Sequence, residues 1–124
     1  MSGNKLLLDT NTILYLLNGD KSVLQLVKDA EIIVSIITEI ELLSSKELKE
    51  KEENQIRKFL ENCLIIDILP QIKTNTILLR KKYGLKLPDA VILSTAYTFN
   101  IPIITADKKL FRINDVEVIK INAT

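Results

Sequence analysis

Short apolar runs alternate with amphipathic stretches along this chain, and the alternation limits the folds that it can adopt. Short runs rich in Ile, Leu and Val predict buried strands, and the stretches between them have the apolar spacing of helices. Strands that alternate with helices are typical of a parallel sheet covered on both faces, so we predict an α/β fold. The predicted strands are Lys5–Leu8, Glu31–Ser35, Leu64–Leu69, Ile101–Thr105 and Val116–Ile121, and the predicted helices are Thr12–Leu17, Val23–Lys28, Thr38–Leu43, Lys46–Leu60, Ile72–Tyr83 and Pro88–Phe99.

Particular residues are expected where these elements begin and end. Ser22 and Thr38 are expected to open the helices that follow them, because hydroxyl side chains accept hydrogen bonds from the first helical N–H groups. Pro70 is expected to end the third strand, since proline lacks the N–H that a strand donates. Gly84 and Asn100 are expected to close two later helices in the left-handed backbone conformation.

The length and composition indicate one globular domain. The 124 residues suffice for one core but not for two, so we predict a single domain over residues 1–124. A hydrophobic share of 47% argues against a disordered chain, and a net charge of +1 excludes a strongly basic, histone-like binder. A single cysteine, Cys63, cannot form an internal disulfide. With no signal-peptide pattern and no run of membrane-spanning length, we expect a cytoplasmic protein.

Four acidic residues lie where apolar runs end or helices begin. Asp9 and Asp107 follow predicted strands, and Glu41 and Asp89 lie near predicted helix starts. In an open parallel sheet, ligands bind beyond the carboxyl ends of the strands. We therefore predict that the four carboxylates lie together at that edge.

Helix capping is the ordinary explanation for each of these acids taken singly. Capping works equally well with Ser, Thr or Asn, however, and does not require four acids at four such positions. Clustered carboxylates repel one another unless protons or cations neutralise them. Because the chain has no His, oxygen-only coordination favours Mg²⁺ or Mn²⁺ over zinc. A metal-dependent phosphodiester hydrolase is the function that this pattern indicates.

At this point the sequence resembles the PIN domain family, and within it the VapC toxins of bacterial and archaeal toxin–antitoxin pairs. The resemblance covers nearly the whole chain, and four strings occur in the family's order and spacing. They are Leu6-Leu-Leu-Asp-Thr-Asn11, Ser35-Ile-Ile-Thr-Glu-Ile-Glu-Leu42, Leu85-Lys-Leu-Pro-Asp-Ala-Val-Ile-Leu-Ser-Thr-Ala96 and Pro102-Ile-Ile-Thr-Ala-Asp-Lys-Lys-Leu-Phe111. The second string selects Glu41, rather than Glu39, as the acid that matches the family.

The resemblance implies a three-layer α/β/α sandwich with a central parallel sheet of about five strands. It also implies a Mg²⁺- or Mn²⁺-dependent endoribonuclease that forms a homodimer and is held by a cognate VapB-like antitoxin. The RNA expected as substrate is tRNA, rRNA or mRNA. Some relatives carry a further acid where this chain has Leu110, so one or two ions per site both fit the sequence.

Roles for the site residues follow as hypotheses. Asp9 and Asp89 are expected to bind the metal directly, Asp107 to complete the site or bind a second ion, and Glu41 to orient the attacking water. Asn11 and Thr105 are expected to align the carboxylates by hydrogen bonds. The lysines that flank the acids in the sequence are expected to attract RNA phosphates; these are Lys81, Lys82, Lys86, Lys108 and Lys109.

Three other functions share part of the pattern. A haloacid-dehalogenase-type phosphatase needs a second acid two residues after the first, where this chain has Asn11. A receiver-type phosphotransfer domain needs an acidic pair after its first strand, and Asp9 stands alone there; Asp67, within an apolar run, is expected at a sheet edge. A non-catalytic PIN-like binding module uses the acids only as caps.

For the antitoxin, apolar residues of the first two helices offer a groove, although core packing explains them equally; they are Ile13, Leu14, Leu17, Leu24 and Val27.

Overall fold

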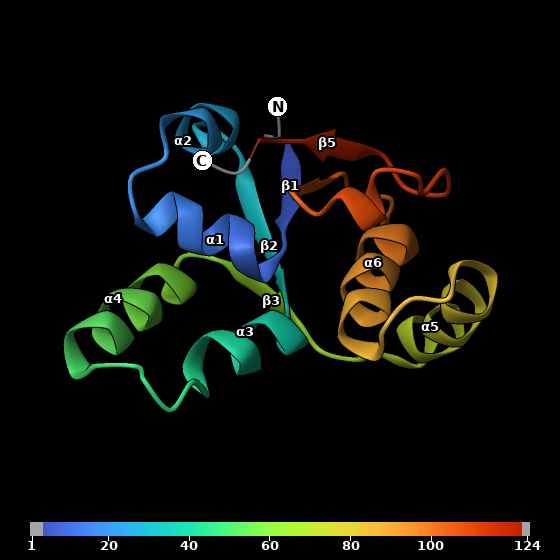
Figure 1. Ribbon diagram of the computed structural model, residues 1–124, viewed down its shortest axis with the longest axis horizontal. Coiled ribbons are helices and arrows are strands. Elements are labelled where there is room, and N and C mark those ends of the chain that lie inside the picture. The colour runs from blue at the N-terminus through green and yellow to red at the C-terminus, as the bar shows by residue number, and fades with distance from the viewer. Residues whose placement is uncertain (1–3, 123–124) are drawn as a thin grey trace.

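A computed structural model describes residues 4–122 and contains one five-stranded parallel sheet (Figure 1). The strand order is β3-β2-β1-β4-β5, so the first strand of the sequence lies in the middle. In register, Leu8 pairs with Ile104 and Leu6 with Ile32. The strands are β1 (Lys5–Leu8), β2 (Glu31–Ser35), β3 (Leu64–Ile66), β4 (Ile103–Thr105) and β5 (Val118–Lys120). The predicted parallel α/β architecture is confirmed.

Six α-helices and one short 3₁₀ helix connect the strands within the described residues. Figure 1 shows α1, α2 and α4 on one side of the sheet, α5 and α6 on the other, and α3 beyond the carboxyl ends of the strands. The helices are α1 (Thr10–Leu17), α2 (Lys21–Val27), α3 (Ile36–Leu43), α4 (Glu50–Glu61), α5 (Pro70–Tyr83), α6 (Leu87–Phe99) and the 3₁₀ helix η1 (Lys108–Leu110).

Two apolar cores lie on the two faces of the sheet because side chains alternate along each strand. Leu6 and Leu8 of β1 point into the core under α1 to α4, and Leu7 between them points into the core under α5 and α6. The central helix α6 is buried along its whole middle, from Ala90 to Ala96. Because helices cover both faces, the strands read as continuous apolar runs.

Most predicted elements are present, but several boundaries differ. Helix α3 begins at Ile36, because Ser35 rather than Thr38 accepts the hydrogen bond from the first turn, at the N–H of Ile37. Asp20, not Ser22, caps α2. The last three strands are shorter than predicted at one or both ends, and the charged helix α4 begins four residues later.

The expected helix ends are largely confirmed. Gly84 and Asn100 both adopt the left-handed conformation, with φ of 67° and 53°, and end α5 and α6. The expectation that Pro70 ends the third strand is wrong, because β3 already ends at Ile66. Pro70 is instead the first residue of α5, where its missing N–H would have no helical partner. In the part of the chain described, no helix has the length and apolar character that crossing a membrane requires.

Candidate active site

The acids meet at the carboxyl ends of the two central strands. Strands β1 and β4 are neighbours in the sheet, so the residues that follow them, Asp9 and Asp107, leave it at the same edge. Helix α3 starts directly after β2 and carries Glu41, and helix α6 carries Asp89 in its first turn. Figure 1 shows α1, α3 and α6 converging at this edge. The topology thus brings together four segments that are distant in the sequence.

Asp9 is fixed by hydrogen bonds at both carboxylate oxygens and is only 9% exposed. Its Oδ1 accepts from the backbone N–H of Thr12 at 3.0 Å, which caps helix α1. Its Oδ2 accepts from the hydroxyl of Thr105 at 2.5 Å, a length typical of a hydroxyl bound to a carboxylate. Each carboxylate oxygen has a further lone pair, so these contacts orient Asp9 and still leave it able to bind a cation.

Thr105, the last residue of β4, links two of the acids. Its side chain is fully buried. Besides donating to Asp9, the Thr105 hydroxyl oxygen accepts from the backbone N–H of Asp107 at 3.0 Å. The carboxylate of Asp107 in turn accepts from the N–H of Lys109 at 2.9 Å and caps the 3₁₀ helix. The hydrogen bond that we expected between Thr105 and a site carboxylate is therefore present.

Glu41 is held by a residue that sequence reasoning missed. The Thr10 hydroxyl donates to Glu41 Oε1 at 2.6 Å and lies 3.3 Å from the hydroxyl oxygen of Thr38. Thr38 lies buried in the first turn of α3 and does not cap this helix, so helix capping does not explain Glu41. Glu41 has no capping task and points to Thr10 across the fold.

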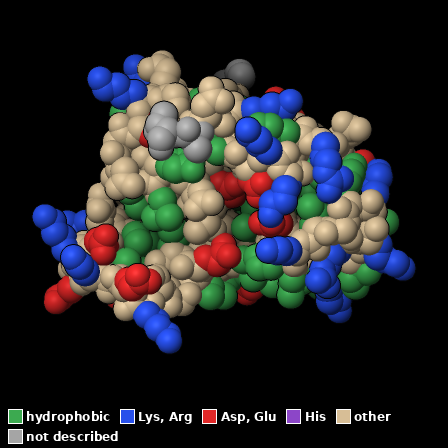
Figure 2. All heavy atoms as spheres, in the orientation of Figure 1, with side chains coloured by type: hydrophobic (Ala, Val, Ile, Leu, Met, Phe, Trp, Pro, Cys, Tyr) green, Lys and Arg blue, Asp and Glu red, His purple; other side chains and the backbone are tan. Residues whose placement is uncertain are grey.

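The electrostatics of Asp89 show that the four carboxylates lie within range of one another. Burial is the main cause that raises the pKa of Asp89 above its usual value, and the negative charges of Asp107, Glu41 and Asp9 raise it further. Lys109 acts in the opposite direction. Figure 2 shows acidic side chains gathered at the centre of this face, with Lys and Arg beside them on the α6 side. Asp89 is thus within electrostatic range of the other three acids at this edge of the sheet.

The family model of the PIN domain matches residues 6–116. The chain belongs to the PIN domain family. Its fold is that of VapC-type members, as the four sequence strings implied. A comparison with curated protein sequences gave no match.

Solved structures similar to this PIN domain come from toxin–antitoxin proteins. The toxin–antitoxin complex from Klebsiella pneumoniae has a chain 31% identical to it, with a TM-score of 0.80 over 93% of this chain and 96% of that one. VapBC2 from Rickettsia felis, bound to a promoter DNA fragment, has a chain 26% identical, with a TM-score of 0.81 over 95% and 99% of the two chains. VapBC-1 from nontypeable Haemophilus influenzae, at 24% identity and a TM-score of 0.77 over 94% and 97%, shares the fold.

The donor set of this PIN domain suits a hard divalent cation. All four side chains offer oxygen, and the raised pKa of Asp89 reports repulsion and burial that a cation would relieve. Between residues 4 and 122, however, no three His, Cys, Asp or Glu side chains are close enough to form a complete metal site. The acids interact across the edge without forming a closed cage. Mg²⁺ commonly keeps several waters and few direct protein ligands, which fits this open arrangement.

Asn11 differs from the prediction made for it. It lies in the first turn of α1 and is exposed, and its side chain has no hydrogen-bond partner among residues 4–122. The alignment of carboxylates expected from Asn11 comes instead from its neighbour Thr10, which bonds to Glu41. Sequence offered little signal for this, since a hydroxyl and an amide both suit a strand-to-helix junction.

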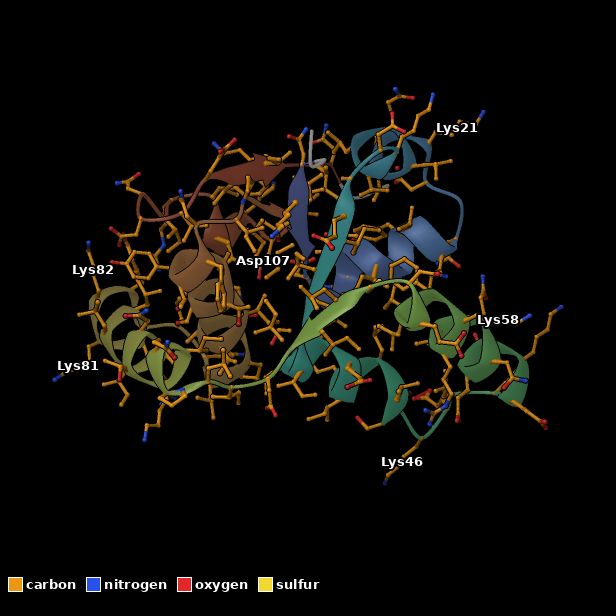
Figure 3. The ribbon with its side chains drawn as sticks, turned by 180° about the vertical axis from the view of Figure 1, so that it is seen from behind. Lys21, Lys46, Lys58, Lys81, Lys82 and Asp107 are labelled. Atoms are coloured by element: carbon orange, nitrogen blue, oxygen red, sulfur yellow. The ribbon has the colours of Figure 1, made fainter. Side chains whose placement is uncertain are left out.

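The five lysines proposed for RNA lie in different surroundings. Lys109 is near enough to Asp89 to lower the pKa of that carboxyl. Lys82 forms an ion pair with Asp115 at 3.0 Å, and Figure 3 shows Lys81 and Lys82 pointing outward at the periphery, away from the centrally placed Asp107. The two remaining lysines, Lys86 and Lys108, are exposed. The structure therefore favours Lys109, and a role for the outer pair stays a prediction.

The rival sequence interpretations lose support in this PIN domain. Asp67 directly follows the edge strand β3, as expected, and its carboxylate accepts from the N–H of Ile68. One strand, β2, lies between β3 and β1 in the sheet order. Asp67 and Asp9 therefore do not form the acidic pair of a receiver domain.

Proposed function

We propose that the chain is a metal-dependent endoribonuclease that hydrolyses RNA phosphodiester bonds, and that it is the toxin of a VapBC-type toxin–antitoxin pair. The observation that carries the proposal is the convergence of Asp9, Glu41, Asp89 and Asp107 at one edge of a PIN fold. The four come from separate elements and include a half-buried acid destabilised by its neighbours. Perturbed acids in such a place are typical of catalytic sites.

Asp9 and Asp89 are the proposed direct ligands of Mg²⁺ or Mn²⁺, with Asp107 completing the site. When bound, such an ion polarises a phosphate and lowers the pKa of a water at neutral pH. The chain's own residues set the geometry: Thr105 fixes the Oδ2 of Asp9, and helix α1 fixes its Oδ1. Glu41 is the group proposed to orient the attacking water, through Oε2, the oxygen that is not bonded to Thr10. Lys109 supplies positive charge for the substrate phosphate.

The decisive experiment incubates the purified protein with tRNA, rRNA and mRNA in the presence of Mn²⁺ or of EDTA. We expect cleavage with Mn²⁺ and none with EDTA. Asp67→Asn, at an exposed acid beyond the edge strand, serves as the matched control for Asp9→Asn. Equal cleavage by wild type and Asp9→Asn would contradict the proposed mechanism. A wild type that binds Mn²⁺ but cuts none of these RNAs would instead favour the non-catalytic binding module.

A VapB-like antitoxin is the proposed partner, since the similar solved structures include toxin–antitoxin complexes. A hollow of about 300 Å³ lies between α1, α3 and α4, and Glu41 of the candidate site forms part of its wall. Its floor is apolar, with Leu14, Leu42 and Ile56, and Glu47 and Glu52 add acidic groups. An antitoxin segment with apolar and basic side chains fits this surface. Of the groove residues predicted from sequence, Ile13 and Val27 are in the core instead.

Inhibition by the antitoxin tests this surface. Leu14→Asp places a charge on the apolar floor and should weaken antitoxin binding while cleavage of RNA continues. Leu78→Asp, at an exposed apolar position on α5, is the control that should leave antitoxin binding unchanged. Unaltered inhibition of Leu14→Asp would place the antitoxin elsewhere.

A homodimer is the proposed state of the toxin. Exposed apolar side chains outside the hollow include Ile40 of α3, Ile77 of α5 and Leu87 of α6, each more than half exposed. Apolar surface of this kind supports association of protein chains. Sedimentation of the wild type and of Ile77→Lys tests it, with a monomer expected only for the variant.

A further inference from the structure

Within residues 4–122, Thr10 donates the one hydrogen bond that the Glu41 side chain accepts. The donor–acceptor distance of 2.6 Å lies in the range of a hydroxyl bonded to a charged carboxylate. The residues are 31 positions apart and belong to different helices, α1 and α3. This contact therefore fixes one catalytic candidate to a distant element and serves neither helix as a cap.

Glu41 needs such a tether more than the other acids do. Its side chain is exposed, whereas Asp9 is buried and Asp89 and Asp107 are partly buried. A glutamate has three rotatable side-chain bonds and loses considerable conformational freedom when it is held in one orientation. Without a partner, the Glu41 carboxylate would turn away from the other negative charges at this edge, because like charges repel.

Thr10 is itself held firmly. It is the first residue of α1, directly after Asp9, whose carboxylate caps that helix. Its hydroxyl oxygen lies against that of Thr38, a fully buried residue of α3. The donor is thus fixed by its own helix and by the helix that carries its acceptor.

The same kind of hydrogen bond, from a threonine to an acid, occurs twice at this edge. Thr105 of β4 donates to Asp9, and Thr10 of α1 donates to Glu41, so that in each pair a threonine on one element orients an acid on another. We propose that Thr10 is a positioning residue that holds the Glu41 carboxylate at the metal-binding edge, beside Asp9. This inference rests on the proposed function and adds to it a residue that acts through Glu41.

Three variants separate this role from a merely structural one. Thr10→Val keeps the branched shape and removes the hydroxyl, and Thr10→Ser keeps the hydroxyl. Thr74→Val is the matched control, because Thr74 is an exposed threonine of α5 whose hydroxyl bonds only to the carbonyl of Pro70. The readouts are Mn²⁺ affinity by calorimetry, the kcat and KM of RNA cleavage, and the midpoint of thermal unfolding.

We expect Thr10→Val to weaken Mn²⁺ binding, because the Glu41 charge is no longer held at this edge, and to lower kcat on the order of 10-fold, the usual cost of losing a partner that orients a group at a metal site. Thr10→Ser should restore both, and Thr74→Val should match the wild type. In a double-mutant cycle with Glu41→Gln, the hydroxyl should lose most of its effect, since its target charge is gone.

The outcomes distinguish this inference from the function on which it rests. Mn²⁺ binding and cleavage by the wild type, with equal values for Thr10→Val, would overturn the role of Thr10 alone. A lower unfolding temperature for Thr10→Val at unchanged Mn²⁺ affinity and kcat would assign Thr10 to structure and overturn it as well. A wild type that neither binds Mn²⁺ nor cuts RNA would overturn both proposals.

Discussion

At the carboxyl ends of the strands, hydrogen bonds between side chains cross the fold, whereas at the amino ends the backbone makes the hydrogen bonds between strands, with one long ion pair between Lys5 and Glu31 beside them. Asp9 bonds to Thr105, and Thr10 to Glu41. At the opposite end, the N–H of Glu31 donates to the carbonyl of Asn4, and that of Ile103 to the carbonyl of Glu117. The hydrogen bonds at the carboxyl ends orient functional groups, and those at the amino ends join strands.

The size of a hollow does not reveal this difference. A hollow of about 590 Å³ lies at the amino ends, lined by Asn4, Phe99 and Pro102 among others. The hollow that reaches Glu41 is only about 300 Å³. Polar side chains that form hydrogen bonds between different helices and strands identify the end of the sheet with the candidate site more reliably than the volume of a hollow does.

The largest expected difference in RNA cleavage is between two variants that each lose one acid, one at the carboxyl ends and one at the amino ends of the strands. Asp9→Asn should reduce RNA cleavage on the order of 100-fold or more, because a neutral amide provides less electrostatic stabilisation at the metal site. Its stability should change little, since Asn also caps helices well. Glu117→Gln, at the amino end, should cleave like the wild type. Initial rates and circular dichroism melts of the two variants check this, and equal losses at both ends would remove the contrast.

Thr105→Val tests whether the cross-element hydrogen bonds matter for stability. The valine leaves Asp9 Oδ2 and the N–H of Asp107 without their partner, so we expect a destabilisation of about 1–3 kcal/mol. Urea unfolding measures it, with Thr105→Ser as the control that keeps the hydroxyl. A loss of less than a few tenths of a kcal/mol would show that the acid is held by other contacts.

Asp89→Asn should separate stability from activity. Burial and three neighbouring carboxylates disfavour the charged form of Asp89, as its raised pKa indicates. Removing that charge should raise the unfolding temperature by a few degrees in EDTA at neutral pH, and should abolish cleavage with Mn²⁺. Such trade-offs are common at functional sites. A lower unfolding temperature for this variant would contradict the repulsion inferred here.

The smallest expected effect lies outside both ends, at Asp115. Hydrogen bonds from Lys82 and Tyr83 lower the pKa of Asp115 below its usual value of 3.8. A lowered pKa means that the contribution to stability is present above about pH 4 and is lost as the pH falls below it. Asp115→Asn should therefore flatten the fall of the unfolding temperature slightly between pH 5 and pH 2.5. An unchanged slope would show that solvent screens this exposed pair completely.

Sequence reasoning predicted the architecture well because the strands are short and continuously apolar. The strand β1 and the strand β2 have the predicted bounds, and Gly84 and Asn100 end their helices as expected. Elements that lack such strong signals have shifted ends: α3 begins at Ile36 because Ser35, a residue of the strand, also caps the helix. One residue that serves two elements is difficult to assign from spacing alone.

The acids of the candidate site could be predicted from the sequence, but the residues that form hydrogen bonds with them were harder to predict. The four acids were identified from their places at the ends of apolar runs, and Thr105 from its place beside Asp107. Thr10 was not, because the partner of its hydroxyl, Glu41, lies on a helix whose direction the sequence does not give. Contacts between side chains of different elements depend on tertiary packing, which local patterns do not specify.

The central place of β4 in the sheet also sets the time at which the site is completed during synthesis. The bond between Asp9 and Thr105 joins residues 96 positions apart, and the last acid, Asp107, follows Thr105 by two residues. At the usual pace of a ribosome, the first acid waits on the order of 10 s for its partners to emerge. A nascent chain of this protein therefore lacks a finished site until β4 and Asp107 have emerged from the ribosome.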